Sequence, residues 1–566
     1  MYNNNITYCP CCRKSNNTGI VSSFYLGKDA TTSVLTQILL KAIDIVDDQH
    51  EKIDEQLFDD NPFLVEEEER KNNKDSVKQL IQFSDGRQQA SFAAIFSDYN
   101  HERFLRKKLL YDACKDSESP LSFSRLKSLL ENQIENYNLF QNKYSEEANG
   151  SSKNAWITIL NELLNIDGNN SAEGLGLFAF KLDLSKIEQG KKYINKIFEN
   201  NGICDYTLKI EEFLDILSVI TNIFRNTPAI EYNDSELSIE DKKEEFSYRM
   251  YDNYIMLQKE KHQIIKNFAG KEITNNVRSL LPVNIGQSNK IINYVMACTG
   301  YELEKAKRFI WICFNHILRT TKIIEECNAI DCYKINANKY KLFGEKQLKW
   351  YRCKKCKSVT IYNCRNICPS CSDSSLELCD PNEIFAGNYY RNEYKNKKVE
   401  KLVFKEHTGQ LTAEQGLKIQ RDFIDKKVNV LSCSTTFEMG VDIGSLETVF
   451  MRNVPPSPAN YVQRAGRAGR GKDSSAFVIT FCGVSSHDYY YFSTPEKMIS
   501  GKIKPPMFKM DNKKIVIRHI MDTALSFYLR LFENDFSNIG SFMNNYYNFE
   551  NYLKSKQEKL SFRRGL

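Results

Sequence analysis

Short apolar runs followed by helical patterns occur in two separate regions of the chain. In the first, the run at residues 77–83 ends at Phe83, a polar turn follows at 84–86, and an apolar-faced helix comes next. The second region extends from about residue 383 to 485. We expect short buried strands there at 428–433, 449–452 and 478–481. Strand–turn–helix units of this kind are typical of an α/β fold with a parallel sheet.

The stretch between these regions, residues 116–345, carries a mostly helical pattern of apolar positions. One helix is predicted by an i, i+3, i+4, i+7 spacing of apolar residues, namely Ile210, Phe213, Leu214 and Leu217. A second long periodic segment covers 301–326. The sequence therefore predicts that a large helical insertion interrupts the α/β domain.

The ends of the chain differ from this middle part. A helix is expected at 34–46, and the acidic stretch 47–75 lacks steady apolar periodicity, which is typical of a solvated linker. The last residues, 501–566, have a mostly helical pattern. The sequence thus divides into seven parts, with bounds at 1–46, 47–75, 76–115, 116–345, 346–380, 381–500 and 501–566.

Composition narrows the class of protein without identifying it. The 566 residues are 41% hydrophobic and 27% charged, which suits a soluble chain of several globular domains and excludes collagen-like and fully disordered chains. No apolar run approaches the roughly 20 residues of a membrane span, so we expect no membrane partner. The net charge of +6 permits nucleic-acid binding but does not identify it.

Two pairs of cysteines have the spacing of metal ligands. Eleven residues separate one CxxC pair from the next, and the four residues are Cys353, Cys356, Cys368 and Cys371. Two such knuckles predict a tetrahedral zinc ribbon within 346–380, because four thiolates favour Zn²⁺ over harder ions. The N-terminus carries no secretory signal, so we expect the protein to be located in the cytoplasm, where cysteines stay reduced. The neighbouring Lys354, Lys355 and Lys357 contact a nucleic-acid backbone or form a solvated charged surface.

The segment 430–471 carries the most informative polar residues. A strand brings Ser434 and Thr436 to its carboxyl end, where open α/β sheets bind ligands. Gly440 then permits a close approach of the backbone to a partner, and Asp442 places a carboxylate beside it.

A helix is expected to begin at Ser457 and Pro458, which suit an N-cap and a first helical position. Further along, Gln463 and Arg467 lie four residues apart and Arg467 and Arg470 lie three apart, so these side chains point to neighbouring faces of one turn. Two guanidinium groups beside an amide suit a compact polyanion such as a phosphate.

These segments resemble the second RecA-like domain of the superfamily 2 DEAD/DEAH-box helicases. STTFEMGVDIG (434–444) resembles their motif V, and QRAGRAGR (463–470) resembles their motif VI. FSDGRQQASF (83–92) is similar to the motif IV strand and turn of a bacterial subgroup that carries a cysteine-rich insertion. The resemblance implies a RecA-like parallel sheet interrupted by the insertion and the zinc ribbon.

The resemblance also implies a role for each matching residue. It makes Arg467 and Arg470 arginine fingers that reach the γ-phosphate of ATP, with Gln463 at the phosphate or the attacking water. Gly440 and Asp442 couple the nucleotide to the nucleic acid, although Asp442 alone is also a common turn former. Contacts to the sugar-phosphate backbone are implied for Ser434, Thr436, Ser84 and Arg87. Arg464 is either a solvated or a salt-bridged helix residue.

The phosphate-binding half of an ATPase is missing from the sequence. Each Gly-Lys pair is followed by Asp, Lys, Glu or Ile, and never by Ser or Thr, so no G-x4-G-K-[ST] loop is present. In the resembled subgroup a CPxC motif such as the one at Cys9 and Cys12 follows an earlier CxxC, so these two cysteines either begin partway through a zinc module or are idle.

We therefore expect the C-terminal half of an ATP-dependent DNA helicase or translocase. It would use ATP and Mg²⁺ together with a first-RecA-domain subunit encoded upstream. DNA is preferred over RNA because the resembled subgroup acts in DNA repair and phage defence. The alternative is a non-catalytic nucleic-acid-binding adaptor derived from a helicase.

Overall fold

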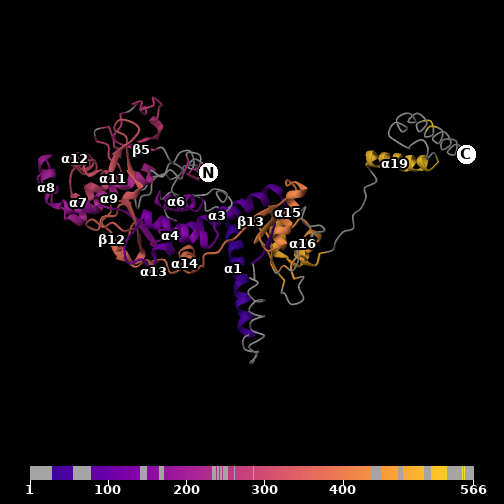
Figure 1. The fold of residues 1–566 in the computed structure, drawn as a ribbon. Coiled ribbons are helices and arrows are strands. Elements are labelled where there is room, and N and C mark those ends of the chain that lie inside the picture. Colours follow the sequence, from indigo (N-terminus) through magenta and orange to yellow (C-terminus); the bar gives the residue numbers. More distant parts are fainter. Residues whose placement is uncertain are drawn as a thin grey trace. The chain divides into compact units, whose positions relative to one another are not determined.

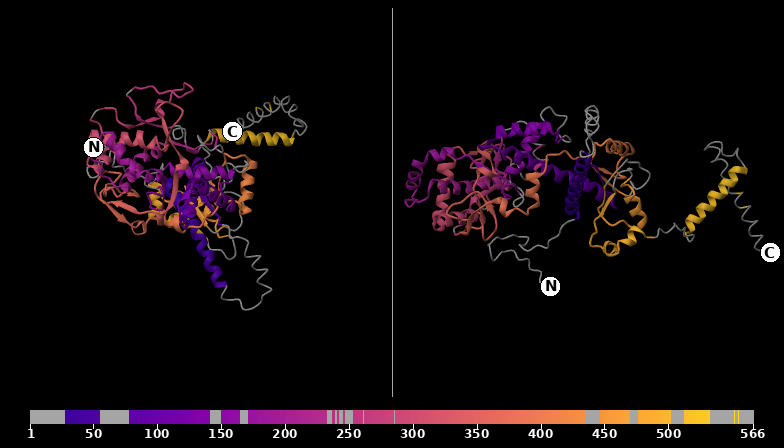
Figure 2. Two further views of the ribbon diagram at one scale, coloured as in Figure 1. Left: turned by 60° about the vertical axis from the view of Figure 1, so that its left-hand side comes forward. Right: turned by 90° about the horizontal axis from the view of Figure 1, so that it is seen from below.

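The structure is a computed structural model, shown in Figure 1 and, from two further directions, in Figure 2. It forms two compact units, one of Met1–Pro455 with Val462–Ser493 and one of Pro456–Tyr461 with Thr494–Leu566. The described residues are 28–54, 78–140, 150–164, 171–232, 237–238, 241, 245–246, 253–260, 262–284, 286–434, 446, 448–469, 476–501, 512–531, 551 and 554.

A five-stranded parallel sheet forms the α/β part of the first unit. Its strand order is β13 (Phe404–His407), β14 (Val430–Cys433), β1 (Leu80–Phe83), β15 (Thr448–Met451) and β16 (Phe477–Thr480). The early strand β1 lies at the centre, where Leu80 is paired with Val430 on one side and with Thr448 on the other. Every residue of β1, β14 and β15 is buried, as expected for parallel strands covered on both faces. The predicted α/β fold with a parallel sheet is confirmed.

Helices cover both faces of this sheet. On one face, Leu39 and Leu40 of α1 (Lys28–Asp54) pack with apolar residues of the strands, and the start of α3 (Arg87–Cys114) is held by a hydrogen bond from Ser432 Oγ to the Ala90 carbonyl (2.7 Å). Residues three apart on a strand face opposite sides, so Phe83 points away from the side of Leu80. There the guanidinium of Arg464, on α16 (Pro458–Ala465), lies 5.7 Å from the Phe83 ring centroid.

The first helix differs from its expected bounds. It begins at Lys28 rather than at residue 34 and ends at Asp54, so the first eight residues of the expected linker 47–75 are helical. Residues 55–75 lie outside the described part of the chain. Among the described helices, none combines the length and the continuous apolar character needed to span a membrane.

The insertion expected at 116–345 contains short strands in addition to the helices that the sequence predicts. Its described residues include helices such as α4 (Phe123–Asn136), α6 (Gly150–Leu163), α9 (Ile210–Asn226), α11 (Lys290–Thr299) and α12 (Leu303–Ile312) (Figure 1). They also form two small sheets. One is β2 (Leu121–Ser122), β9 (Tyr340–Gly344) and β3 (Phe178–Leu182); the other is β4 (Ile230–Glu231), β8 (Tyr333–Asn336), β5 (Tyr254–Gln258) and β6 (Val277–Leu281), with β7 (Ile324–Glu326) paired to β8.

Two specific expectations within the insertion had different outcomes. Helix α9 is confirmed, and both Phe213 and Leu217 are fully buried on its predicted apolar face. The predicted segment 301–326 is not one continuous α-helix. Helix α12 ends at Ile312, a short π-helix follows, and the chain then enters β7. Strands of two to five residues are too short to give a clear alternation of apolar and polar positions.

Helix α3 belongs both to the sheet and to the insertion. Its first half covers the sheet, whereas Phe104 and Leu109 in its second half lie in the large apolar core of the insertion. Phe104 also stacks on Tyr394 of α14 (Tyr389–Asn396), with ring centroids 5.1 Å apart. Arg391, which is also buried on α14, donates hydrogen bonds to the carbonyls of Leu175 and Gly176 (2.6 and 2.8 Å). These contacts fix the insertion to the α/β part.

A buried histidine makes the stability of this junction depend on pH. His101 of α3 is 3% exposed, and its Nε2 lies 3.1 Å from the Glu400 carbonyl, to which it donates as a neutral ring. Burial, aided by the charge of Lys397, lowers its pKa from 6.5 to about 3. The unfolded chain therefore takes up a proton below pH 6.5 that the folded chain refuses, and stability falls as the pH falls.

We predict that His101 alone lowers the free energy of unfolding by about 1.4 kcal/mol between pH 7.5 and pH 5.5. The variant His101→Gln lacks this titration and should lose correspondingly less stability over the same interval. Urea unfolding at the two pH values measures the difference. Equal pH dependence in both proteins would contradict the assignment.

Candidate functional site: the carboxyl edge of the sheet

Three polar residues follow directly after neighbouring strands of the parallel sheet. Ser84 follows β1, Ser434 follows β14 and Arg452 follows β15, so all three lie at the carboxyl edge. Ser84 is fully buried, its backbone N–H donates to the Cys433 carbonyl (2.9 Å), and its hydroxyl accepts a hydrogen bond from Arg452 Nη1 (3.2 Å). Ser434 is also fully buried. The two serines thus belong to the framework of the edge, and their predicted contacts to nucleic acid stay predictions.

Arg452 ties the first helix to this edge. Its side chain is almost completely buried, and Nη2 lies 2.6 Å from Oδ1 of Asp29 and 2.8 Å from Oγ1 of Thr32. Nη1 also donates to the Gln89 carbonyl (3.1 Å). Burial lowers the pKa of Arg452 and the Asp29 carboxylate opposes this change. A buried guanidinium is tolerated only with such partners, so α1 and the turn after β1 are fixed together.

Asp85, in the same turn, joins it to α16. Oδ1 of Asp85 accepts a hydrogen bond from Nη2 of Arg464 (2.7 Å), and Asn453 Nδ2 donates to Oδ2. The backbone N–H of Asp85 in turn donates to Oδ1 of Asn453 (3.2 Å). The Arg464 side chain is fully buried. This pair agrees with the interpretation of Arg464 as a solvated or salt-bridged helix residue.

The residues predicted to contact phosphate lie on and just after α16. Gln463 is exposed, whereas Arg467 is 5% exposed. Burial raises the pKa of the Cys433 thiol and the charge of Arg467 opposes this rise. Most of the Arg467 side chain is covered, and its contact with phosphate stays a prediction.

A glycine allows the chain to turn back along the sheet after Arg467. Gly469 has φ +72°, and its N–H donates to the Leu446 carbonyl (2.7 Å). A Cβ at this position would lie 2.7 Å from that of Ala476, so a larger residue would force the backbone apart.

Other predicted residues are either exposed or outside the described part of the chain. Arg87 is exposed in the first turn of α3, next to Asp85. The residues outside the described part are Cys9, Cys12, Thr436, Gly440, Asp442 and Arg470. Sequence reasoning overlooked Asp29, Arg452 and Asn453. Two of these residues could have been found from the sequence, because Arg452 and Asn453 are polar and directly follow an apolar strand.

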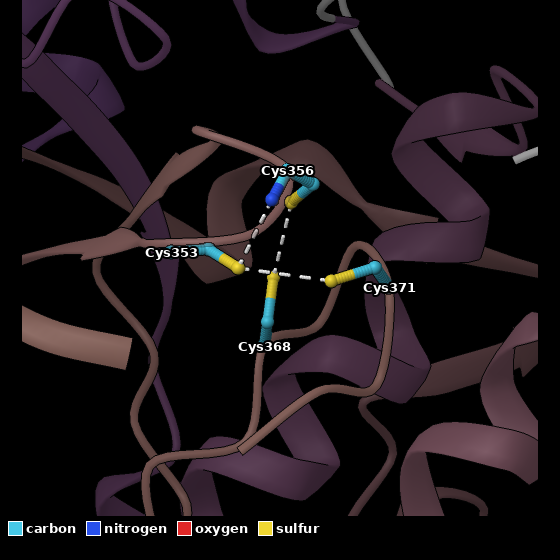
Figure 3. Close-up of side chains that lie close together, drawn as sticks. All are labelled: Cys353, Cys356, Cys368 and Cys371. Atoms are coloured by element: carbon cyan, nitrogen blue, oxygen red, sulfur yellow. Dashed lines mark hydrogen bonds between the residues drawn. The ribbon is translucent and has the colours of Figure 1, made fainter. Parts of the chain in front are cut away.

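The four predicted zinc ligands converge in a separate part of the first unit (Figure 3). They lie around a three-stranded antiparallel sheet of β10 (Trp350–Cys353), β11 (Val359–Thr360) and β12 (Leu376–Cys379). All four Sγ atoms lie within 4.8 Å of one another, with 3.7 Å between Cys353 and Cys371 and 3.6 Å between Cys356 and Cys368. Four sulfurs at 2.3 Å from a tetrahedral zinc ion are about 3.8 Å apart, so the cluster has the size of a zinc site.

The two CxxC segments have the same local geometry. In each, the residue after the second cysteine has positive φ (59° at Lys357 and 57° at Ser372), and its N–H donates to the carbonyl of the first cysteine. A backbone N–H also points to the first sulfur in each segment, from Cys356 and from Ser370 (both 3.4 Å). Such donors stabilise thiolates, and the donor set fits zinc.

Two of the three lysines singled out in the ribbon are paired with acidic residues of the ribbon itself. Lys354 contacts Glu377, and Lys355 Nζ lies 2.7 Å from Oδ2 of Asp373. These pairs favour the solvated charged surface over a contact with nucleic acid. The ribbon also contacts the insertion, because Arg365 Nη1 donates to the Cys298 carbonyl of α11 (3.1 Å).

Three strands of the parallel sheet lie in a segment that matches a family of known proteins. Residues 382–472, which contain β13, β14, β15 and α16, match the helicase conserved C-terminal domain. Druantia protein DruE of Escherichia coli is 36% identical over 195 residues, covering 30% of this chain and 11% of that protein. The ATP-dependent helicase HRQ1 of Saccharomyces cerevisiae is 30% identical over 93 residues, covering 16% of this chain and 8% of that protein.

This chain therefore spans about a tenth of the length of these two relatives. The crystal structure of DUF1998 helicase MrfA bound to DNA is 24% identical over 24% of this chain and 18% of that chain, with a TM-score of 0.21, a value too low to support an argument. The matched domain contains the QRAGRAGR segment, and β1 completes its parallel sheet. These matches identify a helicase conserved C-terminal domain in the α/β part of this chain.

Proposed function

We propose that this chain is the C-terminal half of an ATP-dependent DNA helicase or translocase, and that it acts with a first RecA-like domain on another polypeptide encoded upstream. The observation that carries the proposal is the QRAGRAGR segment, which contains Gln463 and Arg467 and lies in the matched helicase C-terminal domain, in a sequence without a G-x4-G-K-[ST] loop. Phosphate-binding arginines are useful only beside a triphosphate, so another domain must supply its cradle.

In this proposal ATP and Mg²⁺ bind between the two domains. Arg467 and Arg470 stabilise the negative charge that develops on the γ-phosphate, and Gln463 orients the phosphate or the attacking water. Because Arg467 is 5% exposed, its guanidinium has to turn outward when the partner domain closes. Gly440 and Asp442 couple this closure to the nucleic-acid strand.

The contact with nucleic acid is proposed at the same edge. Arg87 is exposed there and can reach a phosphate directly. Thr436 is proposed as a further contact, whereas Ser84 and Ser434 hold the backbone that presents the contacting groups. The preference for DNA over RNA rests on the resemblance of the motif IV segment to a subgroup that acts in DNA repair and phage defence.

A non-catalytic adaptor derived from a helicase is the alternative. An adaptor requires a nucleic-acid-binding surface, but it has no physical need for Gln463, Arg467 and Arg470 together at the nucleotide side of the domain. Their joint presence favours the motor.

We predict that this chain and the product of the adjacent upstream reading frame together hydrolyse ATP when single-stranded DNA is present. Arg467→Ala should lower kcat at least about 100-fold, because an arginine finger stabilises the transition state. The matched control is Arg421→Ala, which removes an exposed arginine from α15 (Ala413–Ile424) of the same domain. No hydrolysis by the mixture, or equal rates with Arg467→Ala, would refute the motor.

We also predict that Arg87→Ala weakens binding to single-stranded DNA about equally for all sequences. The slope of log K against log salt should become less steep by about 0.7, since one phosphate contact is lost. Fluorescence anisotropy at several salt concentrations measures this slope. Arg278→Ala, an exposed arginine of the insertion, serves as the control. Unchanged affinity and slope in Arg87→Ala would show that the contact does not exist.

For the cysteine cluster we propose structural zinc, which would link the two knuckles and hold the ribbon on the insertion. Metal analysis of the purified chain should find zinc in this cluster, and Cys368→Ser should lose that zinc and lower the temperature of unfolding. Cys379→Ser should keep it, because Cys379 lies in the same ribbon outside the cluster. A metal content that does not change in Cys368→Ser would disprove the site.

A further inference from the structure

The turn after β1 and the end of α16 are joined by a charge pair with a buried guanidinium, and the predicted roles of motifs IV and VI do not require this pair. Both oxygens of the Asp85 carboxylate are used, one by Arg464 and the other by Asn453. The two donors lie on either side of the start of α16, with Asn453 before the helix and Arg464 near its end. Asp85 thus fixes both the entry and the last turn of this segment.

Arg464 is also connected directly to Arg467. The backbone N–H of Arg467 donates to the Arg464 carbonyl (3.2 Å), and the N–H groups of Gly466 and Ala468 make equivalent bonds to Val462 and Ala465 (2.9 and 3.0 Å). These bonds continue the helical turn beyond α16. The position of the Arg464 side chain therefore determines where the backbone of Arg467 lies.

The other side of the pair leads to the exposed Arg87. Asp85 and Arg87 are two residues apart in one turn, and Ser84 in the same turn is held by Arg452. The side chain of Arg464 is fully buried, whereas that of Asp85 is 36% exposed. A buried guanidinium that loses its carboxylate is strongly destabilised, so the turn and α16 cannot separate at low cost.

We infer that Asp85 and Arg464 are positioning residues, which hold Arg467 at the nucleotide side and make the Arg87 turn and the end of α16 move as one body. The inference rests on the proposed function for the role of Arg467, but the positioning itself is a property of this chain. Neither residue touches the nucleotide in this account.

The test uses two variants that each remove one carboxylate from a buried arginine. Asp85→Asn acts on the pair with Arg464, and Asp29→Asn acts on the similar pair with Arg452, which has a separation of 2.6 Å and a 42% exposed carboxylate. Hydrogen exchange of the amides at 466–468 is measured in the isolated chain. Turnover is measured with the upstream partner.

Asp85→Asn should raise exchange at 466–468 about tenfold. It should lower kcat about ten- to a hundredfold while KM for ATP changes less than about twofold, because the arginine is misplaced and not removed. Asp29→Asn should leave exchange at 466–468 and kcat unchanged, even where it lowers the overall stability.

A further variant, Arg464→Met, serves if Asp85→Asn fails to fold, because it leaves no unpaired charge in the interior. It leaves Asp85 bonded to Asn453 and should give the same loss of protection and of kcat. Unchanged exchange at 466–468 in the folded variant, or an equal change in Asp29→Asn, would overturn the inference. If the wild-type mixture does not hydrolyse ATP, the proposed function fails, whereas the exchange experiment still decides the positioning role.

Discussion

Two of the buried guanidinium groups in the α/β part of this protein are each paired with a carboxylate from an earlier segment of the chain. Asp29 pairs with Arg452, and Asp85 pairs with Arg464. An unpaired charge at either position would cost several kcal/mol, so these pairs constrain the arrangement of α1, the turn after β1 and α16. The carboxyl edge of the sheet is therefore a rigid surface, on which the few exposed groups have fixed positions.

This rigidity suits a domain that would serve as one half of a two-part motor. A second RecA-like domain moves as a body against its partner, and a loosely held arginine would lose much of its electrostatic effect. Helix α3 extends the same body into the insertion, where Phe104 stacks on Tyr394 of α14. The insertion, which contacts the cysteine ribbon, is thereby attached to α3, the helix that begins at Arg87.

The sequence was sufficient to predict the parts of the structure that depend on local pattern. The apolar runs ending at Phe83 and Cys433 became central strands, and the CxxC spacing led to a compact cluster of sulfur atoms. The strands of the insertion were missed because they are short and their partners are distant in sequence, as for β2 and β9. The burial of Arg464 was not predictable either, since its partner Asp85 lies 379 residues away.

The most direct test is a structure of this chain bound to its partner domain, single-stranded DNA and a non-hydrolysable ATP analogue. The distance between the Arg467 guanidinium and the γ-phosphate is the decisive quantity. We predict a hydrogen-bond distance of about 2.8 Å, with the Asp85–Arg464 pair intact. A γ-phosphate bound elsewhere, with the Arg467 side chain still covered, would contradict the assignment of this chain as half of the ATPase.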